Sequence, residues 1–551
     1  MNRTHPSSNS PSRVRIHATL GTAVFSILLF ALLTPYYATN DDAFIALILR
    51  GTGFVREPSP WTLYLNVILG KSLSTLYALW PGTAWYALLL TTTSALSFWV
   101  ATAVLLQRIR CAQDRLLLAL LLPSLFYLFL FRPQWTTVAV LAAAVGIMGI
   151  VDSLDRDRDP LPGWLGVLLL TVSSLIRTSA LGLGVLSALP FFVLEWRRIS
   201  GKHRNPRPLF LVLLATIAIP LLVQSAAHTK HPEWRDALRY AQLRAKLFQF
   251  VNVPFNERTE PLFKEIGWDR LDYDLYRTWY GGVGRFGLES LEKLDRLKPE
   301  AAPRPWNILG ETLALPAMVF HACLLLLVFL WVPRKKVPLA LLHPAWSGAL
   351  LMSLLVILWA PYRVSAPVLA FTILAVIATA LSAPESPESM RALRGWRALA
   401  LFVITVLFAS SLWQSSVMDH VFRDRETGFR RCTAELSKEK GLLVYFWGNG
   451  IHVDWLRAFD DYRTLDGLNL YPVGWLQSSP HAEAWRTRYS LADPIRDLVD
   501  RADLALAPSE ALPWELYREY MKTKYDLDVK AQEVVNGMGC RVYRVITAGG
   551  R

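Results

Sequence analysis

The sequence predicts an α-helical polytopic membrane protein with about eleven transmembrane helices and a small α/β domain at its C-terminal end. Of the 551 residues, 53% are hydrophobic and only 19% are charged, and apolar runs close to 20 residues long recur along the chain. A run of that length crosses the hydrocarbon core of a bilayer as a helix. A soluble chain of this size would not contain so many such runs.

The order of the apolar runs predicts where the helices lie. The first run follows a polar and basic start and is long for a cleaved signal peptide, so we expect it to remain as a signal anchor. Segment 61–80 has apolar residues at helical spacing and polar residues on its other face, which predicts an interfacial amphipathic helix. The predicted spans are 17–37, 84–106, 116–131, 135–151, 163–176, 179–195, 208–224, 310–332, 338–360, 364–382 and 398–415.

The basic residues predict the orientation. If the N-terminus is cytoplasmic and segment 61–80 does not span, the cytoplasmic tail and loops carry 19 Lys and Arg, as the positive-inside rule favours. The net charge is +14, and Lys and Arg cluster in the short loops between apolar runs. We expect no nucleic-acid partner, because no basic stripe with interleaved aromatic residues is present.

This topology divides the chain into two domains. Residues 1–415 form the predicted transmembrane domain, with extracytoplasmic loops at 38–83 and 225–309, and residues 416–551 form an extracytoplasmic α/β domain. Cys432 and Cys540 both fall in this last domain, where an oxidising compartment allows them to form a disulfide.

The C-terminal domain shows alternating signals for strands and helices. Strands are predicted from buried apolar runs and helices from proline starts followed by helical periodicity. An Asn536-Gly537 pair between two strand patterns predicts a hairpin turn. The predicted strands are 441–446, 503–507, 529–535 and 540–545, and the predicted helices are 494–501 and 513–525.

Two aspartates, Asp41 and Asp42, follow the first span directly on its extracytoplasmic side. One interpretation is structural: Asn40 caps a helix, and both acids favour the positive end of its dipole. The other is catalytic: one carboxylate accepts a proton from an acceptor hydroxyl. The second carboxylate would then help to hold a divalent cation such as Mg or Mn.

Single arginines interrupt the short extracytoplasmic turns: Arg132, Arg177 and Arg363, with Arg50 in the first long loop. Each could reach the lipid headgroups with its charged end. If several converge, they would form a phosphate site, because guanidinium pairs bidentately with phosphate oxygens. Arg177 and Arg363 are the better candidates, since each lies in a very tight turn between two apolar helices.

The second long loop contains the dense stretch GWDRLDYDLYRTWYGG at 267–282. Its acids and aromatic residues would suit a sugar or acceptor site, because rings stack on pyranose faces and acids bind hydroxyls. The alternative is an amphipathic surface helix closed by Gly281-Gly282. His228 and His231 lack an acid that would complete a zinc site. The candidate lining residues are Asp269, Asp272, Tyr273 and Trp279.

The first outer loop, NDDAFIALILRG followed by EPSPWTLYLNVILGKSLSTLY and PGTAWY, is similar to a group of bacterial membrane proteins. The whole plan resembles the GT-C superfamily of integral-membrane glycosyltransferases: acids after the first span, an interfacial helix, about eleven spans and an outer C-terminal domain. The resemblance implies a bacterial plasma (inner) membrane. By this resemblance, the catalytic acid of the family corresponds to Asp41 or Asp42.

The resemblance also implies a reaction. A sugar would move from a polyprenyl-phosphate carrier to an extracytoplasmic glycan, lipid or protein acceptor, with arginines holding the donor phosphate. An exporter, flippase or polymerase of polyprenyl-linked glycans is the alternative function. A transporter would carry functional charges in the middle of its spans, and almost none occur there. No Walker loop is present, which argues against transport driven by ATP.

Overall fold

The computed structural model describes residues 10–109, 112–199, 205, 207–281, 283–297, 316–330, 332–357, 361–381, 394–447, 450–474, 476–508, 514–537 and 540–549. The chain divides into two compact units, each assembled from three stretches. The first unit comprises Met1–Ala38, Tyr86–Leu222 and Pro305–Asp419, and the second comprises Thr39–Trp85, Val223–Arg304 and His420–Arg551. The second unit therefore gathers both long loops and the C-terminal part.

Apolar helices build the described part of the first unit and confirm a polytopic membrane fold. Among the described residues, nine helices are long and apolar enough to cross a membrane, and the shorter apolar helices α7 and α15 coincide with two further predicted spans. The last parts of α9 and α19 belong to the second unit. The helices are α1 (Pro11–Leu32), α4 (Trp85–Leu106), α5 (Ala112–Phe131), α6 (Trp135–Ser153), α7 (Leu161–Ile176), α8 (Thr178–Ile199), α9 (Arg207–Lys230), α15 (Pro316–Phe329), α16 (Val337–Ile357), α17 (Tyr362–Leu381) and α19 (Arg394–Leu436).

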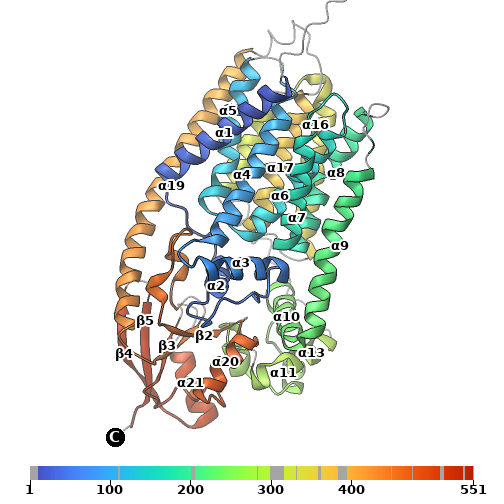
Figure 1. Ribbon diagram of the computed structural model, residues 1–551. Coiled ribbons are helices and arrows are strands. Elements are labelled where there is room, and N and C mark those ends of the chain that lie inside the picture. Colours follow the sequence, from blue (N-terminus) through green and yellow to red (C-terminus); the bar gives the residue numbers. More distant parts are fainter. Residues whose placement is uncertain are drawn as a thin grey trace, which may run out of the picture. The chain divides into compact units, whose positions relative to one another are not determined.

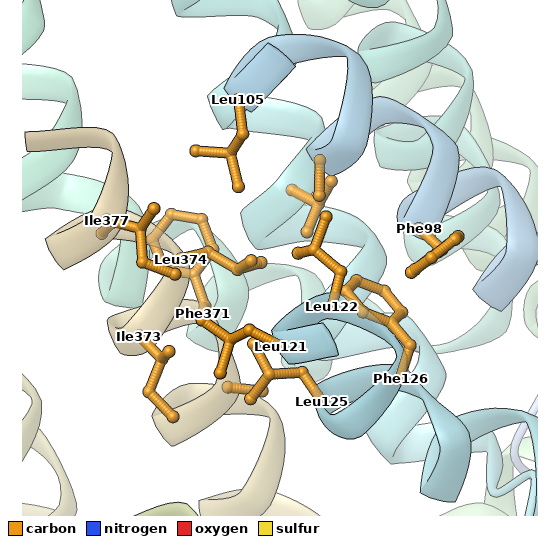
Figure 2. Packing of buried hydrophobic residues seen from close by; sticks show 14 of the residues in the cluster. Phe98, Leu105, Leu121, Leu122, Leu125, Phe126, Phe371, Ile373, Leu374 and Ile377 are labelled. Carbon is orange, nitrogen blue, oxygen red and sulfur yellow. The ribbon is translucent and has the colours of Figure 1, made fainter. Parts of the chain in front are cut away.

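The core of the first unit is a continuous apolar cluster between α4, α5 and α17 (Figure 2). Phe98 of α4 packs against Phe126 of α5 with ring centroids 5.1 Å apart. Leu125 and Phe371 are each 1% exposed or less. Packing of this density holds the helices in fixed register.

Small residues allow α6 and α7 to approach closely. A Cβ on Gly146 would lie 2.7 Å from the carbonyl oxygen of Gly166, and a Cβ on Gly166 would lie 2.4 Å from that of Gly146. Neither position therefore accepts a larger side chain. Close contact through small residues is typical of helices that pack within a membrane.

The second unit combines short helices with one sheet. The interfacial segment forms a helix only from Val67, because the side chain of Asn66 caps the helix by accepting from Ile68 N. Helices α20 and α21 pack against β2 and β4 respectively (Figure 1). The elements are α2 (Asn40–Arg50), α3 (Val67–Leu79), α10 (Pro232–Arg244), η1 (Ala245–Phe250), α11 (Glu260–Glu265), α12 (Arg270–Arg277), η2 (Gly284–Phe286), α13 (Leu288–Arg296), η4 (Val453–Trp455), η5 (Arg463–Leu465), α20 (Pro480–Tyr489) and α21 (Trp514–Tyr525).

The sheet has five strands in the order β2-β1-β3-β5-β4. The first three strands are parallel, and β5 runs antiparallel to both of its neighbours. Asn536 and Gly537 pair with β5 and do not form the turn, so the predicted turn position was wrong and the connection lies outside the described residues. The strands are β1 (Leu443–Trp447), β2 (Asn469–Val473), β3 (Leu504–Ala507), β4 (Val529–Gly537) and β5 (Cys540–Thr547).

The second long loop and the C-terminal part share one hydrophobic core. Tyr276 and Phe286 from the second loop belong to the same buried cluster as Tyr445 and Trp447 of β1. The C-terminal part of the described chain is therefore packed together with the loop helices. A disulfide joins Cys432 of α19 to Cys540 of β5, the pair suggested by the sequence, and closes a separation of 108 residues.

Candidate functional site

The helix α2 carries the two candidate acids in its first turn. Thr39, and not Asn40 as the sequence suggested, is the N-cap residue. The Thr39 hydroxyl donates a hydrogen bond to Asp42 Oδ2 at 2.7 Å. Asp42 is 0% exposed, whereas Asp41 is partly exposed. The helix dipole favours negative charge at both positions.

Aromatic packing fixes α2 against the sheet of the second unit. Phe44 meets Phe446 of β1 edge to face with ring centroids 5.2 Å apart, and Phe54 contacts both rings at 5.0 and 5.3 Å. Edge-to-face pairs of this kind stabilise beyond the apolar area that they bury. The C-terminal part of the chain therefore helps to position the helix that carries Asp42.

The last residue of α2, Arg50, is held by the same unit. Its Nη1 and Nη2 donate to the two carboxylate oxygens of Asp466 at 3.0 and 3.3 Å, and Nη1 also donates to Thr52 at 2.9 Å. The sequence suggested Arg50 as a phosphate ligand. In the structure its guanidinium instead ties the end of α2 to the segment before β2.

Arg177 lies in the turn between α7 and α8 and contacts the start of α6. Its Nη1 donates to Thr136 Oγ1 at 2.8 Å, and its guanidinium carbon lies 4.2 Å from the centroid of the Trp135 ring. A guanidinium over an indole face is favourable, most of all where water is excluded. The side chain is therefore oriented by α6 and does not extend freely.

Arg132 and Arg363 belong to the same neighbourhood of the first unit. Thr137 of α6 donates through its hydroxyl to the backbone oxygen of Arg363 at 3.1 Å. Arg132 precedes the N-cap of α6 by two residues. All three arginines are partly exposed. The structure thus brings Arg132, Arg177 and Arg363 to the first turn of one helix, and a cavity shared with Asp41 and Asp42 stays a prediction.

Asp269 and Asp272 form a capping box at the start of α12. Asp269 Oδ1 accepts from Asp272 N at 2.9 Å, and Asp272 Oδ2 accepts from Asp269 N at 3.2 Å. Lys524 of α21 donates to Asp269 at 2.6 Å and to Asp272 at 2.9 Å. Burial alone would raise the pKa of Asp269, but the hydrogen bonds from Lys524 and Asp272 outweigh it and lower that pKa.

Asp272 is also the centre of a buried network. It is 1% exposed and accepts a hydrogen bond from Tyr520 at 3.1 Å, and Arg285 lies 3.3 Å from it. Neither Lys524 nor Tyr520 had been assigned a role from sequence, although both lie on the correctly predicted helix 513–525. These contacts link α12 to α21, and α12 ends at Arg277, before the Gly281-Gly282 pair that the sequence suggested as its end.

Tyr273 and Trp279 occupy different environments. Tyr273 is buried, and its hydroxyl donates to the backbone oxygen of Val253 at 3.0 Å. Trp279 is partly exposed, has a positive φ of 78°, and covers the guanidinium of Arg244 at 4.3 Å. Residues other than Gly rarely adopt a positive φ, and those that do are often found at functional sites. Trp279 therefore remains a candidate lining residue.

Among the residues that the structure describes, no group of three His, Cys, Asp or Glu side chains is arranged to hold a metal ion. A divalent cation at Asp41 and Asp42 would need oxygen ligands from substrate or water, as Mg²⁺ often has. His228 and His231 both pack against Trp61, with ring centroids 6.1 and 5.2 Å from it.

Neither a protein-family model nor a curated protein matches the sequence. Two solved structures are similar to the chain: ArnT from Cupriavidus metallidurans bound to undecaprenyl phosphate, and the same protein in the apo state. The first gives a TM-score of 0.38 at 12% identity, and the second gives 0.39 at 10%. Both alignments cover 96% of this chain and 97% of the other. At these values the likeness by itself assigns neither family nor function.

Proposed function

We propose that the protein is a membrane glycosyltransferase of the GT-C type that moves a sugar from a polyprenyl-phosphate carrier to an extracytoplasmic glycan, lipid or protein. The observation that carries the proposal is Asp42, a fully buried carboxylate in the first turn of α2, ten residues after the last residue of α1. Burying a carboxylate is costly. A buried carboxylate that follows a membrane-spanning helix is well placed for chemistry at the bilayer surface.

Asp42 would act as the general base. The Thr39 hydroxyl holds Oδ2, and packing of Phe44 against the sheet fixes the helix, so the carboxylate is preorganised. As the acceptor oxygen attacks the anomeric carbon, its proton passes to the carboxylate. The bond from that carbon to the phosphate oxygen breaks, and its electron pair leaves with the polyprenyl phosphate. Asp41 is the second candidate for this role or for holding a cation.

Arg132, Arg177 and Arg363 would bind the donor phosphate. They gather at the first turn of α6, and Arg177 is already oriented by Trp135 and Thr136. Guanidinium groups offset the negative charge that grows on the phosphate oxygens as the sugar departs. The basic cytoplasmic loops support an N-terminus inside a bacterial plasma membrane, with Asp42 on the outer side.

Transfer can be measured in membranes that contain the chain. Undecaprenyl phosphate linked to a tritiated hexose or pentose is supplied, and label entering glycan, lipid and protein fractions is counted. We expect the Asp41→Asn, Asp42→Asn double variant to lose about 10²–10⁴-fold in rate, because Asn retains capping ability but cannot accept the proton. Asp236→Asn, at an exposed site on α10 paired with Arg235, is the matched control.

The outcomes separate the alternative functions. If the double variant still transfers sugar at the wild-type rate, Asp41 and Asp42 are not the catalytic acids and the basis for the proposed transferase is removed. Label that crosses the bilayer while still attached to its carrier would instead identify a flippase or exporter. Chains that grow by repeated addition of carrier-linked units would identify a polymerase.

A further inference from the structure

Three arginines are buried in the described part of the chain: Arg50, Arg108 and Arg244 are 8, 3 and 4% exposed. The first two have carboxylate partners. Arg50 pairs with Asp466 at 3.0 Å. Arg108 pairs with Asp152 at 2.6 Å and with Glu195 at 2.7 Å. Both pairs follow the rule that a buried charge is paired.

Arg244, the last residue of α10, departs from that rule. No carboxylate of the described residues lies within 4.0 Å of its guanidinium. Its Nη2 donates to the backbone oxygen of Tyr276 at 3.2 Å, and the faces of Tyr276 and Trp279 lie 4.6 and 4.3 Å from its central carbon. Its Nε is buried and has no hydrogen-bond partner.

The contacts of Arg244 offset only part of the desolvation of its charge. Aromatic faces attract a cation weakly compared with a carboxylate, and a backbone oxygen carries no net charge. A buried donor without an acceptor adds a further cost. An anion that binds next to the guanidinium would remove both costs.

A second unpartnered donor lies against the same turn. Gln477 is 0% exposed, and its Oε1 accepts from Gly281 N at 3.1 Å. Its Nε2 is buried with no acceptor within 3.5 Å, although the amide lies near the Tyr471 hydroxyl. The turn from Thr278 to Gly281 therefore meets two side chains, Arg244 and Gln477, each of which has one buried nitrogen, Nε or Nε2, without an acceptor. Trp279, in the same turn, has the unusual φ of 78° and is partly exposed.

We propose that Arg244, Gln477 and Trp279 form a subsite for an oxyanion, either a phosphate or a carboxylate group of a ligand. Arg244 would supply the charge, and Gln477 would supply an amide donor. Trp279 would cover the group or the ring that bears it. The subsite lies within the second unit and does not depend on the proposed glycosyl transfer.

Hydrogen exchange on the full chain in detergent tests the site locally. Phosphate, acetate or chloride is added at equal ionic strength, and exchange of the 276–281 amides is followed. We expect phosphate or acetate, but not chloride, to slow exchange there at least several-fold. A response to phosphate alone identifies a phosphate ligand, and a response to acetate alone identifies a carboxylate. No slowing by either anion would overturn the proposal.

Two variants complete the test. Arg244→Met keeps an apolar stem between the two rings and should abolish the slowing. Arg270→Met is the control, because Arg270 also lies over aromatic rings but has a carboxylate partner, Asp274 at 2.8 Å. Slowing that persists in Arg244→Met would contradict the proposal.

Thermal unfolding without added anion distinguishes a ligand site from a structural charge. Arg244→Met removes an unpaired buried charge, so we expect its Tm to match or exceed that of the wild type. Arg50→Met breaks the pair with Asp466, so its Tm should fall by several degrees. A fall for Arg244→Met as large as that for Arg50→Met would assign Arg244 a structural role and end the proposal.

Discussion

The starts of α2 and α12 look alike in sequence but differ in structure. Each has a capping residue, Thr39 or Asp269, followed three positions later by an acid, Asp42 or Asp272. This spacing is typical of a capping box. Both third-position acids are buried, at 0 and 1% exposure. Burial alone therefore does not distinguish a functional acid from a structural one.

The surroundings of the two acids do distinguish them. Asp272 accepts from Lys524 and Tyr520 of α21, so it joins two helices that are far apart in sequence. Asp42 accepts a hydrogen bond from Thr39 in its own turn, and it is followed by seven apolar residues, 43–49. Asp272 therefore links α12 to α21, whereas the hydrogen bond from Thr39 to Asp42 lies within one turn of α2.

Replacing each acid by Asn tests this comparison with the largest expected effect. Asp272→Asn leaves Arg285 without its carboxylate partner and Lys524 with Asp269 alone, so we expect the free energy of unfolding to fall by about 3 kcal/mol. Asp42→Asn keeps an oxygen for the Thr39 hydroxyl, and its stability should change by less than about 1 kcal/mol. Thermal unfolding followed by near-UV circular dichroism measures both variants. Equal losses would show that Asp42 is structural as well.

Replacing Lys524, whose ammonium group contacts both Asp269 and Asp272, should have a smaller effect on stability. Lys524 is 15% exposed in its side chain and contacts both acids of α12, so Lys524→Met should lower the free energy of unfolding by about 1–2 kcal/mol. Lys522→Met is the matched control: it is two residues away on α21, and its partner Asp526 is 91% exposed in its side chain. A loss for Lys522→Met as large as for Lys524→Met would show that helix propensity, and not the network, sets the change.

The sequence predicted those elements whose signal is local. Long apolar runs predicted the helices of the first unit, and apolar strand patterns predicted β1, β3, β4 and β5. It missed β2, which contains Pro472, a residue that is unfavourable in strands. It also missed α20. These errors concern elements with weak local signals that the sheet and core stabilise.

Distant partners explain the remaining differences. The predicted helix 494–501 is a series of turns, because Asp497 accepts from Asp493 N at 2.9 Å and Asp493 accepts from Tyr525 of α21. Arg50 looked available for phosphate because Asp466 lies 416 residues away. No local pattern in the sequence singles out Arg244. Sequence patterns reveal which residues are charged but not which charges the fold brings together.

The smallest expected effect is the pH dependence of Asp269. Burial opposes ionisation of its carboxylate, but the hydrogen bonds from Lys524 and Asp272 prevail and lower its pKa in the folded state. A lowered folded pKa means that the stabilisation is present above the unfolded pKa of about 4 and is lost as the pH falls through the folded value. Asp269→Asn removes the charge and keeps the cap, because Asn caps as well as Asp.

We therefore expect the Tm difference between the wild type and Asp269→Asn to be constant from about pH 8 to pH 5 and to shrink below about pH 4. In a Lys524→Met background, adding Asp269→Asn should change the pH dependence of the Tm less than it does in the wild type. The reason is that the main hydrogen-bond donor to the Asp269 carboxylate is then gone. Asp526→Asn, at a side chain that is 91% exposed, controls for the effect of acid on the whole chain. A Tm difference that grows as the pH falls would have the opposite sign, and would mean that Asp269 is held in its protonated form by α21.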